Sequence, residues 1–340
     1  MLEKVLLGTY TRRESQGIYT IQLDTDKEML SELTLVAQTD SPTYLAKSKS
    51  ENLYAVTSMD GQGGAAAFTS SYQFMNAVTE EGAPLCYVAV DEERQLLYGA
   101  NYHKGEITVS RILADGSLEA LSSLYHTEPT GPHKNQDHAH VHYTDLTPDG
   151  RLVVCDLGTD RVYTYDVESD GTLTLANVWK GEDGMGPRHL VFHQNKKTAY
   201  LFGELDSTVR VLSYNAEDGS FDERQKISTL PEDYTGENGG AAIRLSNDGR
   251  FLYASNRGHD SIAVFAVSED GTALTTTQII SSEGNFPRDF ALDPSNKFVV
   301  CANQNTDNLT LYLRDPETGK LTLRQKNIYA PECVCVYFDR

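Results

Sequence analysis

Residues 186–221 read GPRHLVFHQNKKTAYLFGELDSTVRVLSYNAEDGSF, and the same pattern returns twice further along the chain. Residues 239–274 read GGAAIRLSNDGRFLYASNRGHDSIAVFAVSEDGTAL, and residues 286–321 read FPRDFALDPSNKFVVCANQNTDNLTLYLRDPETGKL. Each copy holds three short runs of apolar or alternating residues, and a weaker fourth run follows the turn. A repeat of about 45–50 residues with four short strands is typical of one blade of a β-propeller.

The rest of the chain extends this repeat to seven blades. First strands of further units start at SPTYLA (41–46), APLCYVAV (83–90) and HAHVHYTDL (138–146). Three strands without a first strand lie at the N-terminus, and one strand without partners, CVCVYF (333–338), lies at the C-terminus. We therefore predict an all-β, seven-bladed propeller of four-stranded antiparallel blades, as a single domain over residues 1–340. Pairing of residues 333–338 with residues 4–9 would close the ring and leave no open edge.

Composition and charge exclude several classes of function. The formal net charge is −20, and no basic face is visible in the sequence, so we exclude nucleic acids and anionic membranes as partners. No run reaches the roughly 18–20 apolar residues needed to span a bilayer, and the start, MLEKVLLGTYT, reads directly into a strand rather than a signal peptide. We expect a cytoplasmic protein. Against its acidic composition, any local group of Arg and His residues is a candidate site.

Aligned repeats bring charged residues to matching positions. In a propeller the first strand of each blade lines the central channel, and the ends of the second strands lie near its mouth. One explanation is that these charges pair with one another across wet space; the other is that they form a site. The charged or polar residues at these positions are Thr43, His140, Arg188, Arg288 and Glu332 on first strands, and Tyr10, Ser58, Tyr102, Glu204, Arg257 and Gln304 at the ends of second strands.

Ester hydrolysis without a nucleophilic Ser or Cys can be built from such residues. A base must take a proton from water, and cationic donors must stabilise the oxyanion that forms. Either Glu204 or His140 could be the base. Arg188 and Arg257 could stabilise the oxyanion or bind an anionic substituent, because their planar guanidinium groups suit phosphate and carboxylate.

The whole chain resembles a known family. The segment DHAHVHYTDLTPDGRLVVCDLGTDRVYTY (137–165), the copy from Gly186 and the stretch NDGRFLYASNRGHDSIAVF (247–265) are similar to the lactonase family of seven-bladed propellers. That family contains the bacterial propeller-type 6-phosphogluconolactonase and the fungal carboxy-muconate lactonizing enzyme. The resemblance implies a carboxylic-ester hydrolase whose catalytic residues are His140, Arg188, Glu204 and Arg257.

A histidine cluster raises the question of a metal. His138, His140 and His142 would share one face of a strand, and Asp137 and Asp145 lie nearby. Zinc sites use such ligands in fixed geometry. The family resemblance argues against a metal here, so we expect neither a metal nor an organic cofactor.

The leading hypothesis is hydrolysis of a sugar lactone, 6-phospho-D-glucono-1,5-lactone, to 6-phosphogluconate in the pentose phosphate pathway. A lactonizing isomerase or cyclase acting on a muconate-like acid is the alternative within the same class. A non-catalytic propeller that serves as a scaffold or ligand-binding protein is the alternative from another class. The expected partner is a small anionic substrate, and the oligomeric state stays open. The candidate substrate-binding residues are Arg288, His142, Asn256, Tyr102 and Glu332.

Overall fold

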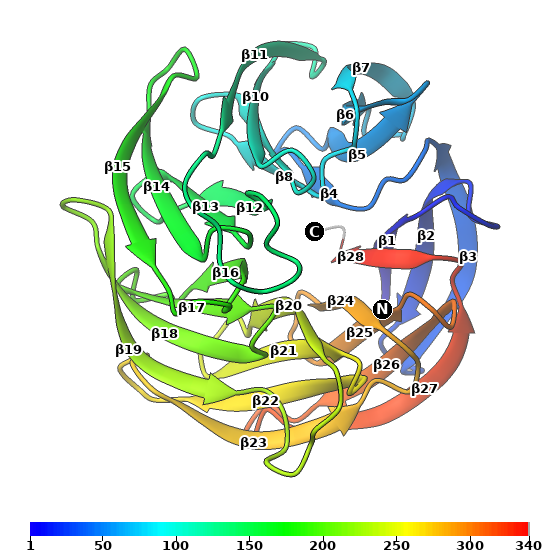
Figure 1. Ribbon diagram of the computed structural model, residues 1–340. Coiled ribbons are helices and arrows are strands. Elements are labelled where there is room, and N and C mark those ends of the chain that lie inside the picture. Colours follow the sequence, from blue (N-terminus) through cyan, green and yellow to red (C-terminus); the bar gives the residue numbers. More distant parts are fainter. Residues whose placement is uncertain (339–340) are drawn as a thin grey trace. The chain divides into compact units, whose positions relative to one another are not determined.

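The fold is built entirely from β-strands. The structure is a computed structural model that describes residues 1–338, and in this range it contains the strands β1 to β28 and no helix (Figure 1). Residues 1–338 therefore hold no helix that could cross a bilayer. The strands form seven sheets of four strands each, which confirms the seven predicted four-stranded repeats.

The sheets follow one another along the chain. The N-terminal sheet has the order β28 (Cys333–Phe338), β1 (Leu2–Thr9), β2 (Gly17–Asp24) and β3 (Met29–Gln38). Next come β4 (Leu45–Lys47), β5 (Leu53–Met59), β6 (Gln62–Phe68) and β7 (Phe74–Glu81). The third sheet contains β8 (Tyr87–Asp91), β9 (Leu96–Asn101), β10 (Glu106–Ile112) and β11 (Leu118–Tyr125). The fourth contains β12 (Val141–Leu146), β13 (Leu152–Asp156), β14 (Arg161–Val167) and β15 (Leu173–Lys180). The fifth contains β16 (Pro187–Phe192), β17 (Thr198–Gly203), β18 (Thr208–Asn215) and β19 (Ser220–Ser228). The sixth contains β20 (Gly239–Leu245), β21 (Phe251–Arg257), β22 (Ser261–Val267) and β23 (Leu274–Ser281). The seventh contains β24 (Pro287–Leu292), β25 (Phe298–Asn303), β26 (Asn308–Arg314) and β27 (Leu321–Tyr329).

Contacts along the described chain group its residues into two compact units. The first unit contains Met1–Gln38, His189–Ser213 and the described residues from Glu223 on, and the second contains Thr39–Arg188 and Tyr214–Asp222. The first unit holds the complete sheets β28-β1-β2-β3, β20–β23 and β24–β27. The second holds the complete sheets β4–β7, β8–β11 and β12–β15.

Burial explains why three runs of each repeat are apolar and the fourth is weaker. All six residues of β25 are buried, as are all six of β9, because such inner strands are covered on both faces. In β27 only the first residue, Leu321, is buried, and the other residues are exposed or partly buried, because one face of this strand meets solvent. In the first unit, β21, β22, β24, β25 and β26 all contribute buried residues to one apolar cluster, so the sheets β20–β23 and β24–β27 pack face to face.

The C-terminal strand completes the N-terminal sheet. β28 runs antiparallel to β1, with Val5 opposite Phe338 and Leu7 opposite Val336 (Figure 1). Side chains of both strands enter one apolar cluster with Phe298 of β25. The predicted pairing of the two ends of the chain is therefore confirmed.

The prediction that a strand covers His138–His142 is wrong at its N-terminal end. β12 begins only at Val141, so His138 and His140 precede it. The backbone N–H of His140 donates instead to the Asp156 carboxylate, at 2.8 Å, and this side chain replaces a ladder bond between β12 and β13. His142 lies at a register shift between the pairs of Val141 and Tyr143, which also breaks the simple alternation that the sequence predicted.

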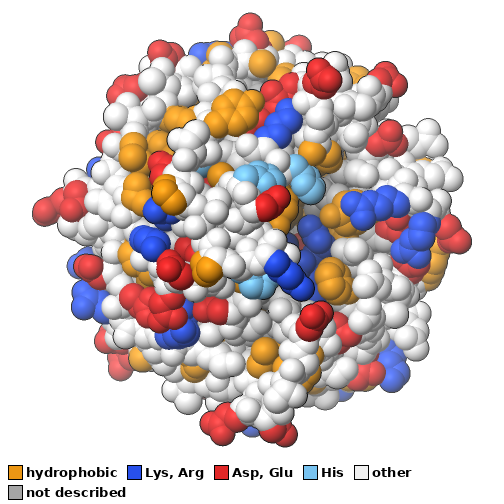
Figure 2. All heavy atoms as spheres, in the orientation of Figure 1, with side chains coloured by type: hydrophobic (Ala, Val, Ile, Leu, Met, Phe, Trp, Pro, Cys, Tyr) orange, Lys and Arg blue, Asp and Glu red, His pale blue; other side chains and the backbone are white. Residues whose placement is uncertain are grey.

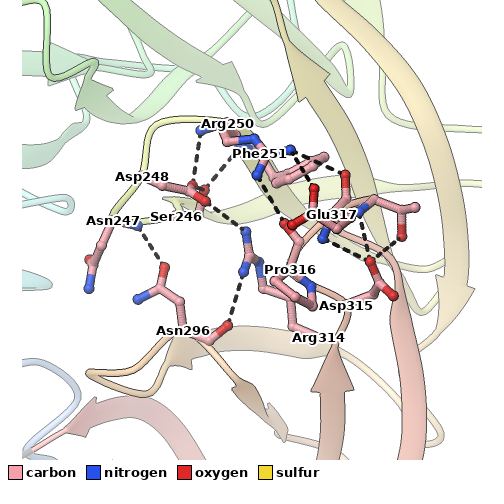
Figure 3. Close-up of polar contacts among 12 residues, drawn as sticks. Ser246, Asn247, Asp248, Arg250, Phe251, Asn296, Arg314, Asp315, Pro316 and Glu317 are labelled. Atoms are coloured by element: carbon pink, nitrogen blue, oxygen red, sulfur yellow. Dashed lines mark hydrogen bonds and ion pairs between the residues drawn. The ribbon is translucent and has the colours of Figure 1, made fainter.

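A buried arginine links two neighbouring sheets of the first unit. Arg314, the last residue of β26, donates from Nε to the Tyr253 hydroxyl at 2.8 Å and from Nη1 to the Asn296 carbonyl at 3.1 Å. Its Nη2 forms an ion pair with Asp248 at 3.5 Å (Figure 3). Tyr253 and Asp248 belong to the repeat of β20–β23, whereas Arg314 belongs to the next one. This side chain therefore ties the two repeats together.

Arg314→Met is expected to lower the free energy of unfolding by about 2 kcal/mol, since two buried hydrogen bonds are lost at about 1 kcal/mol each. Urea unfolding followed by circular dichroism measures the change. Arg250→Met is the matched control, because the nearby pair of Arg250 and Glu317 (Figure 3) has side chains that are 50% and 79% exposed. An exposed pair contributes less than about 1 kcal/mol. Equal losses in the two variants would contradict a linking role for Arg314.

Candidate active site

Glu204 and Arg257 meet in the first unit, where the second strands of two neighbouring sheets end. Arg257 is the last residue of β21, and Glu204 directly follows β17. Nη2 of Arg257 lies 2.9 Å from Oε2 of Glu204 and donates to the carbonyl of Gly240 at 2.5 Å. Their side chains are only 7% and 16% exposed. Low exposure strengthens the electrostatic interactions of such a pair.

Two glycines leave room for this ion pair. A Cβ atom on Gly239 would lie 3.3 Å from Nη2 of Arg257, and one on Gly240 would lie 2.7 Å from the ring of Phe202. The backbone N–H of Gly240 donates to the Glu204 carbonyl at 2.8 Å. The GG sequence at the start of β20 therefore allows the strand to approach the guanidinium and the carboxylate closely.

Burial lowers the pKa of Arg257, and the positive charge of Arg288 adds to this shift, while Glu204 opposes it. Arg288 is thus close enough for its positive charge to contribute to the lowered pKa of Arg257. Within residues 1–338, the buried Nε of Arg257 has no hydrogen-bond acceptor. A buried guanidinium whose N–H has no acceptor can stabilise a negative charge that develops on a bound substrate.

Two further arginines stack on Tyr10, which directly follows β1. The guanidinium carbon of Arg12 lies 3.9 Å from the Tyr10 ring centroid, and that of Arg288 lies 5.6 Å from it. In the described part of the chain, neither guanidinium forms a hydrogen bond or an ion pair with a protein group. Two guanidinium groups without acidic partners are unusual in a chain of net charge −20, and they form a cationic pair around one aromatic ring.

A pocket of about 380 Å³ opens beside this cationic pair. Its volume falls in the range of small-molecule sites, about 300–1,000 Å³. The residues that line it are Tyr10, Arg12, Arg13, Gln304, Asn305 and Glu332. Of the cationic pair, Arg12 lines this pocket and Arg288 does not, so the pocket places Arg12 beside polar side chains at a scale that fits a sugar-sized ligand.

Glu332 holds the loop that presents Arg12. Its carboxylate is 4% exposed and accepts four backbone N–H groups of this loop at 2.9–3.1 Å. The donors are Arg12, Arg13, Glu14 and Ser15. A carboxylate that accepts so many backbone bonds fixes the loop conformation, so Glu332 positions this wall of the pocket.

Three predicted residues meet in the second unit. The rings of Tyr102 and His140 stack at 4.1 Å between centroids with an interplanar angle of 17°, and His142 meets Tyr102 edge-on at 5.8 Å. Both ring nitrogens of His140 have partners: Nδ1 lies 2.7 Å from the Tyr102 carbonyl oxygen, and Nε2 lies 2.9 Å from Oδ1 of Asp137. Figure 2 shows surface histidines on the face in view, one group of them beside an acidic side chain.

Two other predicted residues are buried. Arg188 is the second residue of β16 and is 3% exposed. Asn256 is fully buried, and its amide holds two loop segments: Oδ1 accepts from the Thr229 hydroxyl and from Nδ2 of Asn238, at 2.7 and 3.1 Å. Its Nδ2 donates to the Thr229 carbonyl and to the Ser261 hydroxyl. All hydrogen-bonding positions of the Asn256 amide are therefore used by the protein.

The structure thus brings Glu204, Arg257 and Arg288 together in the first unit, and Tyr102, His140 and His142 together in the second. Sequence reasoning missed Arg12. The available signal was its place just beyond the end of the first strand, next to Arg13, in a chain with a large excess of acidic residues.

Comparisons with known proteins agree along the whole chain. The family model described as "Lactonase, 7-bladed beta-propeller" matches residues 4–338, which confirms the predicted fold class. A protein of Bacillus subtilis named 6-phosphogluconolactonase is 44% identical over 340 residues, covering 98% of this chain and 97% of that protein. A crystal structure of a Lactobacillus plantarum protein is 51% identical, with a TM-score of 0.98 and full coverage of both chains. The structure of the periplasmic gluconolactonase PpgL of Pseudomonas aeruginosa is 30% identical, with a TM-score of 0.93 and 99% coverage of both chains.

Proposed function

The chain belongs to the lactonase family of seven-bladed β-propellers, and from this premise we propose that it hydrolyses 6-phospho-D-glucono-1,5-lactone to 6-phosphogluconate. The name of the Bacillus subtilis relative supports this substrate. The Pseudomonas aeruginosa relative is named for a lactone without a phosphate. The decisive question is therefore whether the site selects a phosphorylated lactone.

The observation that favours a phosphorylated substrate is the cationic pair of Arg12 and Arg288 on Tyr10. A guanidinium group binds phosphate through two parallel hydrogen bonds, and no acidic side chain in the described chain competes for these two groups. The adjoining pocket of about 380 Å³ provides space for the sugar. Arg288 also acts electrostatically on Arg257, so an anion bound by Arg288 would lie close to the Arg257–Glu204 pair.

The proposed reaction needs only water and side chains. The oxygen of a water molecule attacks the carbonyl carbon of the lactone while Glu204 takes one of its protons. Arg257 donates to the oxyanion that forms on the carbonyl oxygen. When the ring C–O bond breaks, the ring oxygen leaves as the sugar hydroxyl and recovers the proton. His140 is the alternative base, and Arg188 is a second proposed cationic donor; both rest on the family pattern and are tested by substitution.

Phosphate selection provides the direct test. The protein should accelerate acid release from freshly made 6-phosphogluconolactone above the spontaneous rate. Arg288→Ala should raise KM for this substrate by about 10-fold or more, since a charge-assisted contact of at least 1.4 kcal/mol is lost. KM for unphosphorylated glucono-1,5-lactone should stay unchanged. A pH-stat or a pH indicator measures both reactions.

Arg250→Ala is the matched control, because Arg250 is an exposed arginine of the same unit that pairs with Glu317 and should alter neither KM. Equal turnover of both lactones, unaffected by Arg288→Ala, would reject phosphate recognition but keep lactone hydrolysis. No acceleration of either lactone would reject the proposed function, and ring closure of a muconate-like acid would then support a lactonizing enzyme.

A phosphorylated substrate also indicates where in the cell the protein acts. Sugar phosphates are charged and are retained by membranes, so we propose that the protein acts in the cytoplasm, on the pentose phosphate pathway.

A further inference from the structure

Asp137, His138 and His140 form a group of three possible metal ligands in the second unit. Nε2 of His140 and Nδ1 of His138 lie 2.9 and 3.1 Å from the same oxygen, Oδ1 of Asp137. These ligand atoms all lie within 4.8 Å of one another. Since zinc bonds to imidazole nitrogen and carboxylate oxygen are about 2.0–2.2 Å long, neighbouring ligands of one ion lie about 3.0 Å apart in octahedral geometry and about 3.4 Å apart in tetrahedral geometry. The two N···O distances match the octahedral spacing and are slightly shorter than the tetrahedral one.

Backbone carbonyls determine which nitrogen of each ring carries the proton. Nδ1 of His140 lies 2.7 Å from the Tyr102 carbonyl, and Nε2 of His138 lies 2.9 Å from the His103 carbonyl. A carbonyl oxygen only accepts, so each of these nitrogens must donate an N–H. Binding of the distal N–H by a carbonyl is the usual arrangement for histidines that ligate a metal.

The remaining nitrogens then face a group that cannot donate to them. A neutral imidazole has one N–H, so Nε2 of His140 and Nδ1 of His138 present lone pairs to Oδ1 of Asp137, which is itself an acceptor when ionised. Protons on both nitrogens would resolve this, but they would place two positive rings with centroids 4.0 Å apart. One divalent cation would satisfy all three atoms at once.

The loop that carries Asp137 is held firmly. Gln136 is 2% exposed, and its Nε2 donates to the Leu157 carbonyl at 2.8 Å and to Oδ1 of Asp160 at 2.7 Å. Its Oε1 accepts the backbone N–H of His133 at 2.9 Å. The backbone of Asp137, the next residue in the sequence, is therefore fixed before any ion binds. This reduces the conformational entropy that is lost on binding.

Solvent reaches the group from one side. The side chain of Asp137 is 70% exposed and that of His138 is 45% exposed, whereas that of His140 is 4% exposed. An ion could enter past Asp137 and keep water in its remaining positions. The acidic charge of the whole chain, −20, also favours a cation.

We propose that Asp137, His138 and His140 bind one divalent transition-metal ion of the zinc class. Two imidazole nitrogens and one carboxylate oxygen suit Zn²⁺, Co²⁺ or Ni²⁺ better than Mg²⁺ or Ca²⁺, which prefer oxygen ligands. This site departs from the metal-free expectation drawn from the family resemblance. It shares His140 with the proposed hydrolysis, in which His140 is the alternative base. Metal binding is nevertheless measured without any lactone, so failure of one proposal can be distinguished from failure of the other.

Cobalt titration tests the proposal on the full-length protein without a histidine tag, after treatment with EDTA and dialysis. One Co²⁺ per chain should bind, with visible absorption bands typical of nitrogen and oxygen ligands, and Zn²⁺ should displace it. Asp137→Asn and His138→Gln should each weaken binding by at least about 10-fold. Far-UV circular dichroism verifies that both variants fold.

His133→Asn is the matched control, since His133 lies in the same loop but outside the group of ligands. Its Nδ1 accepts the N–H of Asn135 at 3.2 Å, a bond that an asparagine oxygen can replace. Binding by this variant should equal that of the unaltered protein. Absence of cobalt bands, or equal binding by folded Asp137→Asn and His138→Gln variants, would overturn the proposal.

Discussion

Replacing Arg257 by lysine is expected to lower kcat for 6-phosphogluconolactone by about 10²–10³-fold, the usual cost of removing one donor to an oxyanion. The guanidinium of Arg257 reaches Glu204 and the Gly240 carbonyl from one nitrogen, while its buried Nε has no acceptor among the described residues. Lysine keeps the charge, but its single nitrogen cannot occupy both the position of Nη2, which holds these two partners, and the position of Nε. Lysine at this position therefore tests the planar donor rather than the charge.

Stability has to be separated from catalysis in this experiment, because Arg257 is buried against Glu204. Arg314→Lys is the matched control: Arg314 is also a buried, ion-paired arginine of the first unit, and it lies in the contact between two repeats shown in Figure 3. We expect it to lose stability and keep its kcat. Both are measured by steady-state kinetics and thermal melts. Full kcat in Arg257→Lys, or a loss that follows only the unfolded fraction, would contradict a catalytic role for Arg257.

Deleting residues 333–340 is expected to abolish cooperative folding. β28 supplies Cys333, Val336 and Phe338 to a core that also contains Val5 and Phe298. Loss of these three buried side chains, at about 1.5–3 kcal/mol each, removes about 5–9 kcal/mol. This equals most of the stability of a typical protein, about 5–15 kcal/mol. The deletion also exposes the edge of β1, which favours aggregation.

Far-UV circular dichroism during heating and size-exclusion chromatography measure the effect of the deletion. Phe338→Leu is the control, since it keeps the strand and most of the buried volume and should cost less than about 1.5 kcal/mol. A truncated protein that stays monomeric and melts in one sharp transition near the temperature of the full chain would contradict the importance of the β1–β28 pairing.

Local sequence was enough to predict the sheets. The apolar runs of the copy from Gly186 and its sister repeats appear as strands, and the unpaired run at Cys333–Phe338 found its partner in Lys4–Thr9. Such patterns are readable because each sheet is formed by residues close in sequence, and a strand covered on both faces must be apolar along its length. The start of β12 was missed, because the Asp156 side chain takes the place of a backbone partner at His140.

Only part of the candidate site could be predicted from the sequence. Alignment of the repeats identified Glu204, Arg257 and Arg288, whose strands repeat the same register. It did not identify Arg12, because a loop between β1 and β2 has no repeat to align with. The scaffold role of Asn256 could not be predicted either, since its four hydrogen bonds go to the two ends of the loop 229–238 and to Ser261 at the start of β22.

The sequence alone therefore determined the number of blades, the pairing of the two ends of the chain and the strand ends at which charged residues occur. Only the tertiary structure decided which of those charges have partners. It joined Arg257 to Glu204 and directed two histidines to one oxygen of Asp137. It left the guanidinium groups of Arg12 and Arg288 on Tyr10 with no acidic partner among residues 1–338. The physical reason is that apolar periodicity is a local property of the chain, whereas the partner of a charge depends on side chains that come from distant segments and meet within a few ångströms.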